Sequence, residues 1–156
     1  MSYEIKQGVL AYFMPNIPLA DDAATVLKEI DIGASSADHG EFVCFRPCMV
    51  KRFAFAVTGE AVSGTSVAPT VIFTKRPTPL SSSGEAVVCT LTIPSGTAIG
   101  KVVYKDVTPV AFAVGDSIEV SHTVGTGTPT GMGHAFFECE EDPEYVGNNS
   151  DMILSA

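Results

Sequence analysis

The alternation of residue types in Ser117–Thr123 constrains the fold most. Ile118, Val120 and, less clearly, His122 fall on one side of an extended chain, and polar residues occupy the positions between them. A side-chain period of two is typical of a β-strand with one face buried and the other in water. A Gly115-Asp116 turn precedes the segment. This part of the chain therefore predicts an antiparallel sheet with one apolar face.

The rest of the chain repeats this pattern. Apolar or alternating runs at 41–46, 49–58, 66–75, 85–93, 101–107 and 109–113 are separated by turns rich in Gly, Pro, Ser and Thr. About eight short strands at regular spacing predict an all-β, single-domain antiparallel sandwich, with an eight-stranded jelly roll favoured over a seven-stranded immunoglobulin-like sandwich. A chain of 156 residues, 46% of them hydrophobic, is long enough to bury a core in one domain.

Composition divides the chain into three segments. Residues 1–24 are broken by prolines and predict an extended N-terminal arm, residues 25–143 form the sandwich, and residues 144–156 form an acidic tail. Residues 20–32 allow a short helix or a strand, and a strand is favoured.

The local signals also predict where strands begin and end. Residues 58–65 predict a turn, and the Gly/Thr-rich stretch 125–133 predicts a flexible hairpin tip. Pro69 places the 66–75 strand at a sheet edge or delays its start to Thr70.

The charge balance excludes several partners. The net charge of −9 argues against nucleic acid, because phosphate binding needs clustered Lys and Arg. No run approaches the ~18 apolar residues that span a bilayer, and residues 1–13 lack the pattern of a secretory signal. We therefore expect assembly in a cytoplasm, with all four cysteines as reduced thiols.

Candidate metal and catalytic residues are sparse. Cys44 and Cys48 have only His39 and Cys89 as loose zinc-ligand partners, so core thiols are favoured over a metal site. The expectation for His122 and His134 is a cross-strand pair on a polar face. No nucleophile frame or cofactor loop is present, which predicts a non-enzymatic protein without cofactor or metal.

The acidic residues near the C-terminal end allow two interpretations. Glu138, Glu140, Glu141 and Asp142 could bind calcium, but a charged tail or salt-bridge surface is favoured. Bases lie earlier in the chain, so the basic and acidic stretches could pair between copies, or could simply be scattered, solvated charges.

Three segments resemble small structural proteins of tailed bacteriophages. They are the turn and strand AVGDSIEVSHT, the loop and acid-ended strand GMGHAFFECEEDP, and the strand-loop-strand LTIPSGTAIGKVVY. The resemblance covers residues 85–143 best and 42–84 weakly. It implies a jelly-roll virion subunit, most specifically a capsid decoration (cement) protein. Such a protein binds the major capsid protein and neighbouring copies of itself, as a homotrimer, on the outer surface of the virion.

The residues expected to bind partners are apolar groups of the N-terminal arm and bases of the first half: Tyr12, Phe13, Ile17, Leu19, Arg46, Lys51 and Arg52. The alternative function is a receptor- or glycan-binding module of a phage fibre or tail. That class uses exposed aromatic side chains, and this chain has no Trp and 4 Tyr. A cupin-like enzyme would need a His/Glu metal set on adjacent strands, and three scattered histidines argue against it.

Overall fold

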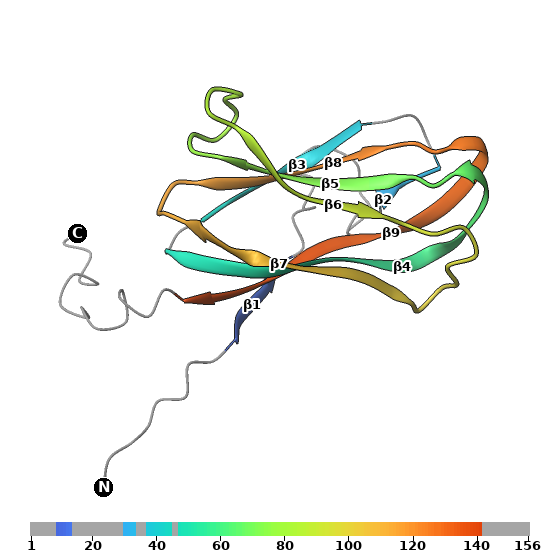
Figure 1. The fold of residues 1–156 in the computed structure, drawn as a ribbon, viewed down its shortest axis with the longest axis horizontal. Helices are drawn as coiled ribbons and strands as arrows, with labels where there is room; N and C mark the ends of the chain where they lie inside the picture. Colours follow the sequence, from blue (N-terminus) through green and yellow to red (C-terminus); the bar gives the residue numbers. More distant parts are fainter. Residues whose placement is uncertain (1–8, 14–29, 34–36, 45–46, 142–156) are drawn as a thin grey trace, which may run out of the picture.

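The computed structural model describes residues 9–13, 30–33, 37–44 and 47–141. Within them the chain forms nine strands, which confirms the all-β prediction (Figure 1). Their bounds are β1 (Val9–Phe13), β2 (Ile30–Asp31), β3 (Ala37–Val43), β4 (Cys48–Val67), β5 (Thr70–Arg76), β6 (Ala86–Thr92), β7 (Val102–Phe112), β8 (Ser117–Thr123) and β9 (Thr126–Glu141).

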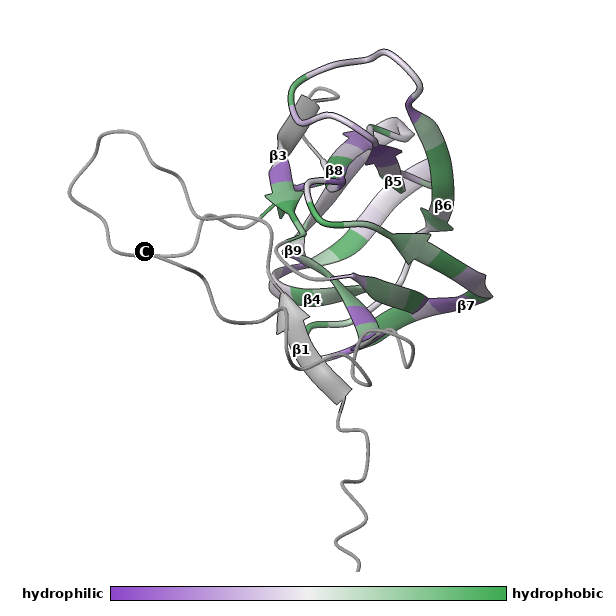
Figure 2. Cartoon of the chain, turned by 90° about the vertical axis from the view of Figure 1, so that its left-hand side faces the viewer, coloured by the Kyte–Doolittle hydropathy of each residue, from purple (hydrophilic) through white to green (hydrophobic). Residues whose placement is uncertain are grey.

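The strands form two antiparallel sheets that pack face to face (Figures 1 and 2). Sheet A has the order β1-β9-β4-β7, and β2 pairs with an earlier part of β9, at Met132 and Gly133. Sheet B has the order β3-β8-β5-β6. The pairs β1/β9, β3/β8, β4/β7 and β5/β6 are nested within one another along the chain. This nested, two-sheet wrapping is the jelly-roll topology, so the predicted sandwich is confirmed.

The core lies between the sheets and is centred on stacked phenylalanines. Phe53 of β4 lies 4.7 Å from Phe73 of β5 and 6.4 Å from Phe137 of β9, measured between ring centroids. All three side chains are fully buried, as are Ile118 and Val120 of β8. The alternation that predicted β8 therefore places its apolar residues in the core, because successive side chains of a strand point to opposite faces.

The pairing of β4 with β9 extends into two segments for which turns were predicted. Residues 58–65 continue β4, and residues 126–133 begin β9; the two segments pair from Val57↔Gly133 to Val67↔Thr126 with repeated bulges. The predictions of a turn at 58–65 and a hairpin tip at 125–133 are therefore wrong. Each stretch is too rich in Gly and Thr to be read locally as a strand, and each is stabilised by the other through backbone hydrogen bonds.

Glycines in this pairing allow a close approach that no other residue permits. A Cβ at Gly133 would lie 2.0 Å from the carbonyl oxygen of Ala56 and 2.8 Å from the ring of Phe55. We expect Gly133→Ala to lower the free energy of unfolding by about 3 kcal/mol, because the clash is with backbone that cannot move without separating β4 from β9. Chemical denaturation measures this loss.

Gly96→Ala provides the matched control for Gly133→Ala. A Cβ at Gly96 meets nothing within 4 Å, but the residue has φ +86°. This substitution therefore tests backbone strain alone, which we expect to be about 1–2 kcal/mol. A Gly133→Ala variant no less stable than Gly96→Ala would contradict the close packing of β4 on β9.

Several strand boundaries also differ from expectation. The two segments predicted at 101–107 and 109–113 join in one strand, β7 (Val102–Phe112). It is the outermost described strand of sheet A, beside β4. Pro109 is tolerated there because it falls at a register shift on an edge strand. β3 begins at Ala37, ahead of the run predicted at 41–46. β5 begins at Thr70, as Pro69 predicted.

Part of the predicted N-terminal arm belongs to the sheet. Val9–Phe13 pairs with β9, so this segment is a strand of sheet A. In the region of ambiguous helix or strand, Ile30–Asp31 is a strand, and Ile30 and Ile32 are buried. The remainder of 1–24, residues 25–29 and the predicted tail at 144–156 lie outside the described residues.

Candidate functional site: the outer groove of sheet A

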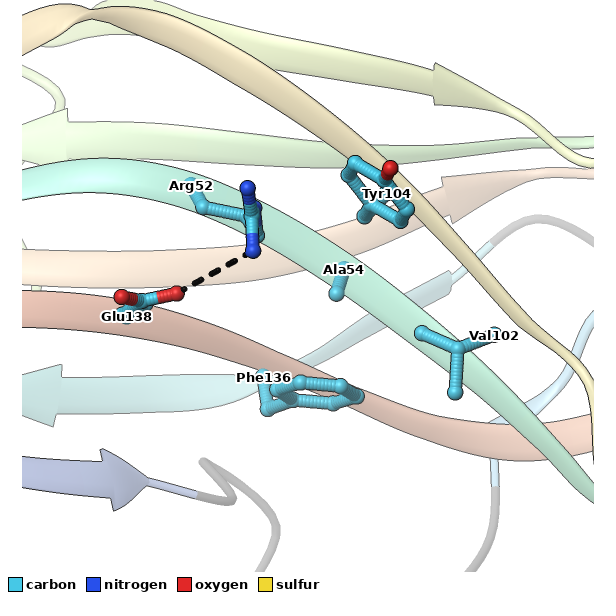
Figure 3. Close-up of a pocket in the computed structure, with 6 residues that line it drawn as sticks. All are labelled: Arg52, Ala54, Val102, Tyr104, Phe136 and Glu138. Atoms are coloured by element: carbon cyan, nitrogen blue, oxygen red, sulfur yellow. Dashed lines mark hydrogen bonds and ion pairs between the residues drawn. The ribbon is translucent and has the colours of Figure 1, made fainter.

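The face of sheet A that points away from the core carries a groove, which we call the outer groove. It is lined by Arg52, Ala54, Val102, Tyr104, Phe136 and Glu138 and encloses about 270 Å³. Figure 3 shows its side chains: Tyr104 and Val102 on β7, Phe136 and Glu138 on β9, and Ala54 on β4 between them.

The register of the three strands creates the outer groove. Ala54 is directly opposite Tyr104 on one side and Phe136 on the other. A methyl group between two aromatic residues leaves a gap at the floor, and Ala54 is only 1% exposed because its neighbours rise above it. Tyr104 is 58% exposed, so one wall of the groove is open to solvent. The result is an accessible apolar slot across three strands.

A row of charges closes one end of the slot. Arg52 is opposite Asp106 and Glu138 in the register, and its guanidinium donates hydrogen bonds to Asp106 Oδ1 at 2.6 Å and to Glu138 Oε2 at 3.5 Å. The guanidinium carbon also lies 4.6 Å from the centroid of the Tyr104 ring. These contacts hold Arg52 against the aromatic wall, where cation–π attraction adds to the ion pairs.

The ion pair between Arg52 and Asp106 shifts the pKa of both side chains. The hydrogen bond from Arg52 lowers the pKa of Asp106 and raises that of Arg52. A carboxylate with a depressed folded-state pKa contributes stability above its unfolded pKa and loses that contribution as pH falls through the folded value. By carboxyl NMR titration, we expect the Asp106 midpoint below the ordinary value of about 3.9, and Arg52→Gln should move it upward. A midpoint unchanged by this substitution would contradict the pairing.

The structure places only part of the predicted partner-binding set at this groove. Arg52 lines it, and Lys51 lies beside it. In the backbone register, Tyr12 is opposite Glu138 and Phe13 is opposite Phe137, so β1 is the strand of sheet A on the other side of β9 from β4. Ile17, Leu19 and Arg46 lie outside the described residues.

The bases and acids of this region pair within one chain. Lys51 pairs with Glu140 and Arg52 with Glu138, both across β4 and β9. These contacts agree with the predicted salt-bridge surface for Glu138 and Glu140. They also mean that Lys51 and Arg52 already have acidic partners without a second copy.

Sequence reasoning missed Tyr104 and Phe136, the two walls of the groove. The sequence marks both only as members of strand-like segments. No local signal distinguishes them, because the groove depends on which residues of β7 and β9 stand opposite Ala54. The register of three strands, and not any motif, brings them together.

A second polar cluster lies on sheet B around Arg76. Its guanidinium contacts Glu119 at 2.7 Å, Glu85 at 3.2 Å and Glu41 at 3.6 Å, and its side chain is 16% exposed. Glu41 also accepts hydrogen bonds from the Ser117 hydroxyl at 2.7 Å and from the Leu80 backbone at 2.8 Å. This arrangement fixes the 77–85 loop to the sheet and is structural in character.

The histidines are not arranged as predicted. His122 is buried on β8 in sheet B, whereas the half-buried His134 lies on β9 in sheet A. The prediction of a cross-strand pair is therefore wrong, because their strands belong to different sheets. Within the described part of the chain, no group of three or more His, Cys, Asp or Glu residues is arranged to hold a metal ion.

The described residues also contain no helix of the length and hydropathy needed to cross a membrane. No protein-family model, curated protein or solved structure matches the chain.

Proposed function

We propose that the protein is a non-enzymatic virion structural protein, a capsid decoration protein that binds the major capsid shell through the outer groove. The observation that carries the proposal is the groove itself. Tyr, Phe and Arg side chains surround a small apolar slot, and these residue types are enriched at the centres of protein interfaces. The resemblance of residues 85–143 to virion proteins supplies the class of partner.

The groove suits insertion of one apolar side chain from the partner. Its floor is the methyl group of Ala54, and its walls are the Tyr104 and Phe136 rings. The charged row at its end already satisfies Arg52 with two carboxylates. A partner that covers this row therefore does not bury an unpaired guanidinium, which would oppose binding.

The experiment that tests the proposal is co-sedimentation of the protein with shells of the major capsid protein from the same virus. We expect Tyr104→Ala to weaken binding about 30-fold, the size of a loss of about 2 kcal/mol at an interface hot spot. Ala54→Leu, which fills the slot and keeps every charge, should weaken binding as strongly.

Val67→Ala is the matched control. Val67 is 59% exposed, almost the same fraction as Tyr104, and it lies at the far end of β4 from the charged row. Binding should be unchanged in this variant. Equal losses in Val67→Ala and Tyr104→Ala, or none in Tyr104→Ala and Ala54→Leu, would contradict docking through the groove.

A second candidate, a glycan-binding module, is favoured by the exposed Tyr104 ring. Flat aromatic faces stack on sugar rings, and the carboxylates of Asp106 and Glu138 can accept hydrogen bonds from hydroxyl groups. Saturation-transfer NMR with methyl pyranosides distinguishes the two functions. A signal that is lost in Tyr104→Ala favours glycan binding, and shell binding without any such signal favours the capsid function.

A further inference from the structure

Three of the four cysteines meet at one corner of the sandwich. Cys44 follows β3, Cys48 begins β4, and Cys139 lies near the end of β9 opposite Val50, two residues along β4 from Cys48. The Cys48 thiol is hydrogen-bonded to both Cys44 and Cys139. The three sulfur atoms thus form a chain with Cys48 in the middle, and Cys89 lies apart from it on β6.

Access to the chain of thiols is through its middle member. Cys44 and Cys139 are buried, whereas Cys48 is partly exposed. The backbone of Cys44 is fixed by two hydrogen bonds, from its N–H to the carbonyl of Asp116 at 2.8 Å and from the Gly115 N–H to its carbonyl at 2.9 Å. A reagent in solution therefore reaches Cys48 first, and Cys44 is held beside it.

The three thiols differ in the direction of their pKa shifts. The hydrogen bond from Cys48 lowers the pKa of Cys44 despite its burial. The bond from Cys139 lowers the pKa of Cys48, but its bond to Cys44, burial and nearby negative charge together raise it to about 12. The bond to Cys48 and burial raise the pKa of Cys139. The first thiolate therefore forms on Cys44 and can pass to Cys48 when the shared proton moves along their hydrogen bond.

We propose that Cys48 is a thiol–disulfide exchange site that reacts with a low-molecular-weight disulfide, such as glutathione disulfide, and passes the bond to Cys44. The Cys48 thiolate attacks one glutathione sulfur, which forms a mixed disulfide and releases one glutathione thiolate. The Cys44 thiolate then attacks the Cys48 sulfur of the mixed disulfide and expels the second glutathione thiolate. Two protein thiols are oxidised, glutathione disulfide is reduced, and the two protons from the cysteines end on the two glutathione thiols.

The product would join the two sheets at their corner. Cys44 directly follows β3 of sheet B, and Cys48 begins β4 of sheet A. A disulfide between them would therefore link the two sheets covalently. A bond from Cys48 to Cys139 would only link two strands that already pair. The site does not depend on the outer groove or on capsid binding.

The test uses the reduced full-length chain incubated with glutathione disulfide, followed by native thiol counting and peptide mass spectrometry. We expect a Cys44–Cys48 disulfide, with Cys89 and Cys139 still reduced. Cys44→Ser should stop at glutathione on Cys48, and Cys48→Ser should prevent both adduct and disulfide. Cys89→Ser is the matched control and should react as the wild type does.

Three results would overturn the proposal. They are four unreacted thiols in the folded wild type, oxidation that persists in Cys48→Ser, and a Cys48–Cys139 bond in place of Cys44–Cys48. Circular dichroism of each serine variant tests whether the sandwich is intact, and so distinguishes a loss of reactivity from unfolding.

Discussion

Phe53→Ala is expected to lower the free energy of unfolding by about 3–5 kcal/mol, a large part of the 5–15 kcal/mol that stabilises a typical domain. Phe53 is fully buried and contacts Phe73 of sheet B and Phe137 of sheet A. Its removal leaves a cavity between the sheets that neither sheet can close without bending. Urea denaturation followed by circular dichroism measures the loss.

The control for Phe53→Ala is Val67→Ala. Val67 is exposed, and substitutions at such positions usually change stability by no more than about 0.5 kcal/mol. A Phe53→Ala loss below about 1 kcal/mol would mean that the phenylalanine cluster does not hold the two sheets together.

Arg76→Ala is the second large effect, with an expected loss of about 3–5 kcal/mol. The substitution leaves Glu41 and Glu119, both largely buried, facing Glu85 without their cation. Repulsion between desolvated carboxylates, more than the lost attraction, drives the destabilisation. The same denaturation assay applies, and the double variant Arg76→Met with Glu119→Gln should recover part of the loss, because it also removes one of the uncompensated charges.

Arg52→Gln tests whether an exposed ion-pair cluster contributes less to stability than the buried cluster around Arg76. Arg52 also contacts two carboxylates, but its side chain and that of Asp106 are well exposed. Ion pairs between exposed side chains contribute little to stability, because water and salt screen the charges. Equal losses in Arg52→Gln and Arg76→Ala would contradict the distinct roles of the two clusters.

The sequence predicted well those elements whose signals are local. The alternation in Ser117–Thr123, the Gly115-Asp116 turn and the late start at Thr70 all match the structure. Each depends on side-chain period or backbone chemistry within a few residues. The all-β class and the jelly-roll order followed from the number and spacing of such segments.

Elements defined by distant partners could not be predicted. Residues 58–65 and 126–133 resemble turns individually and become strands because each supplies the hydrogen bonds of the other. The same reason applies to the outer groove, where Arg52 was expected to bind a partner but Tyr104 and Phe136 were not recognised. It applies again to Cys139, whose contact with Cys48 depends on the register of β9 against β4.

The most direct test of the central claim is an electron cryo-microscopy map of shells decorated with the protein. The account predicts that the outer face of sheet A meets the shell, with a capsid side chain seated over Ala54 between Tyr104 and Phe136. A map in which this groove faces solvent while another surface contacts the shell, or in which the protein does not decorate shells, would contradict it.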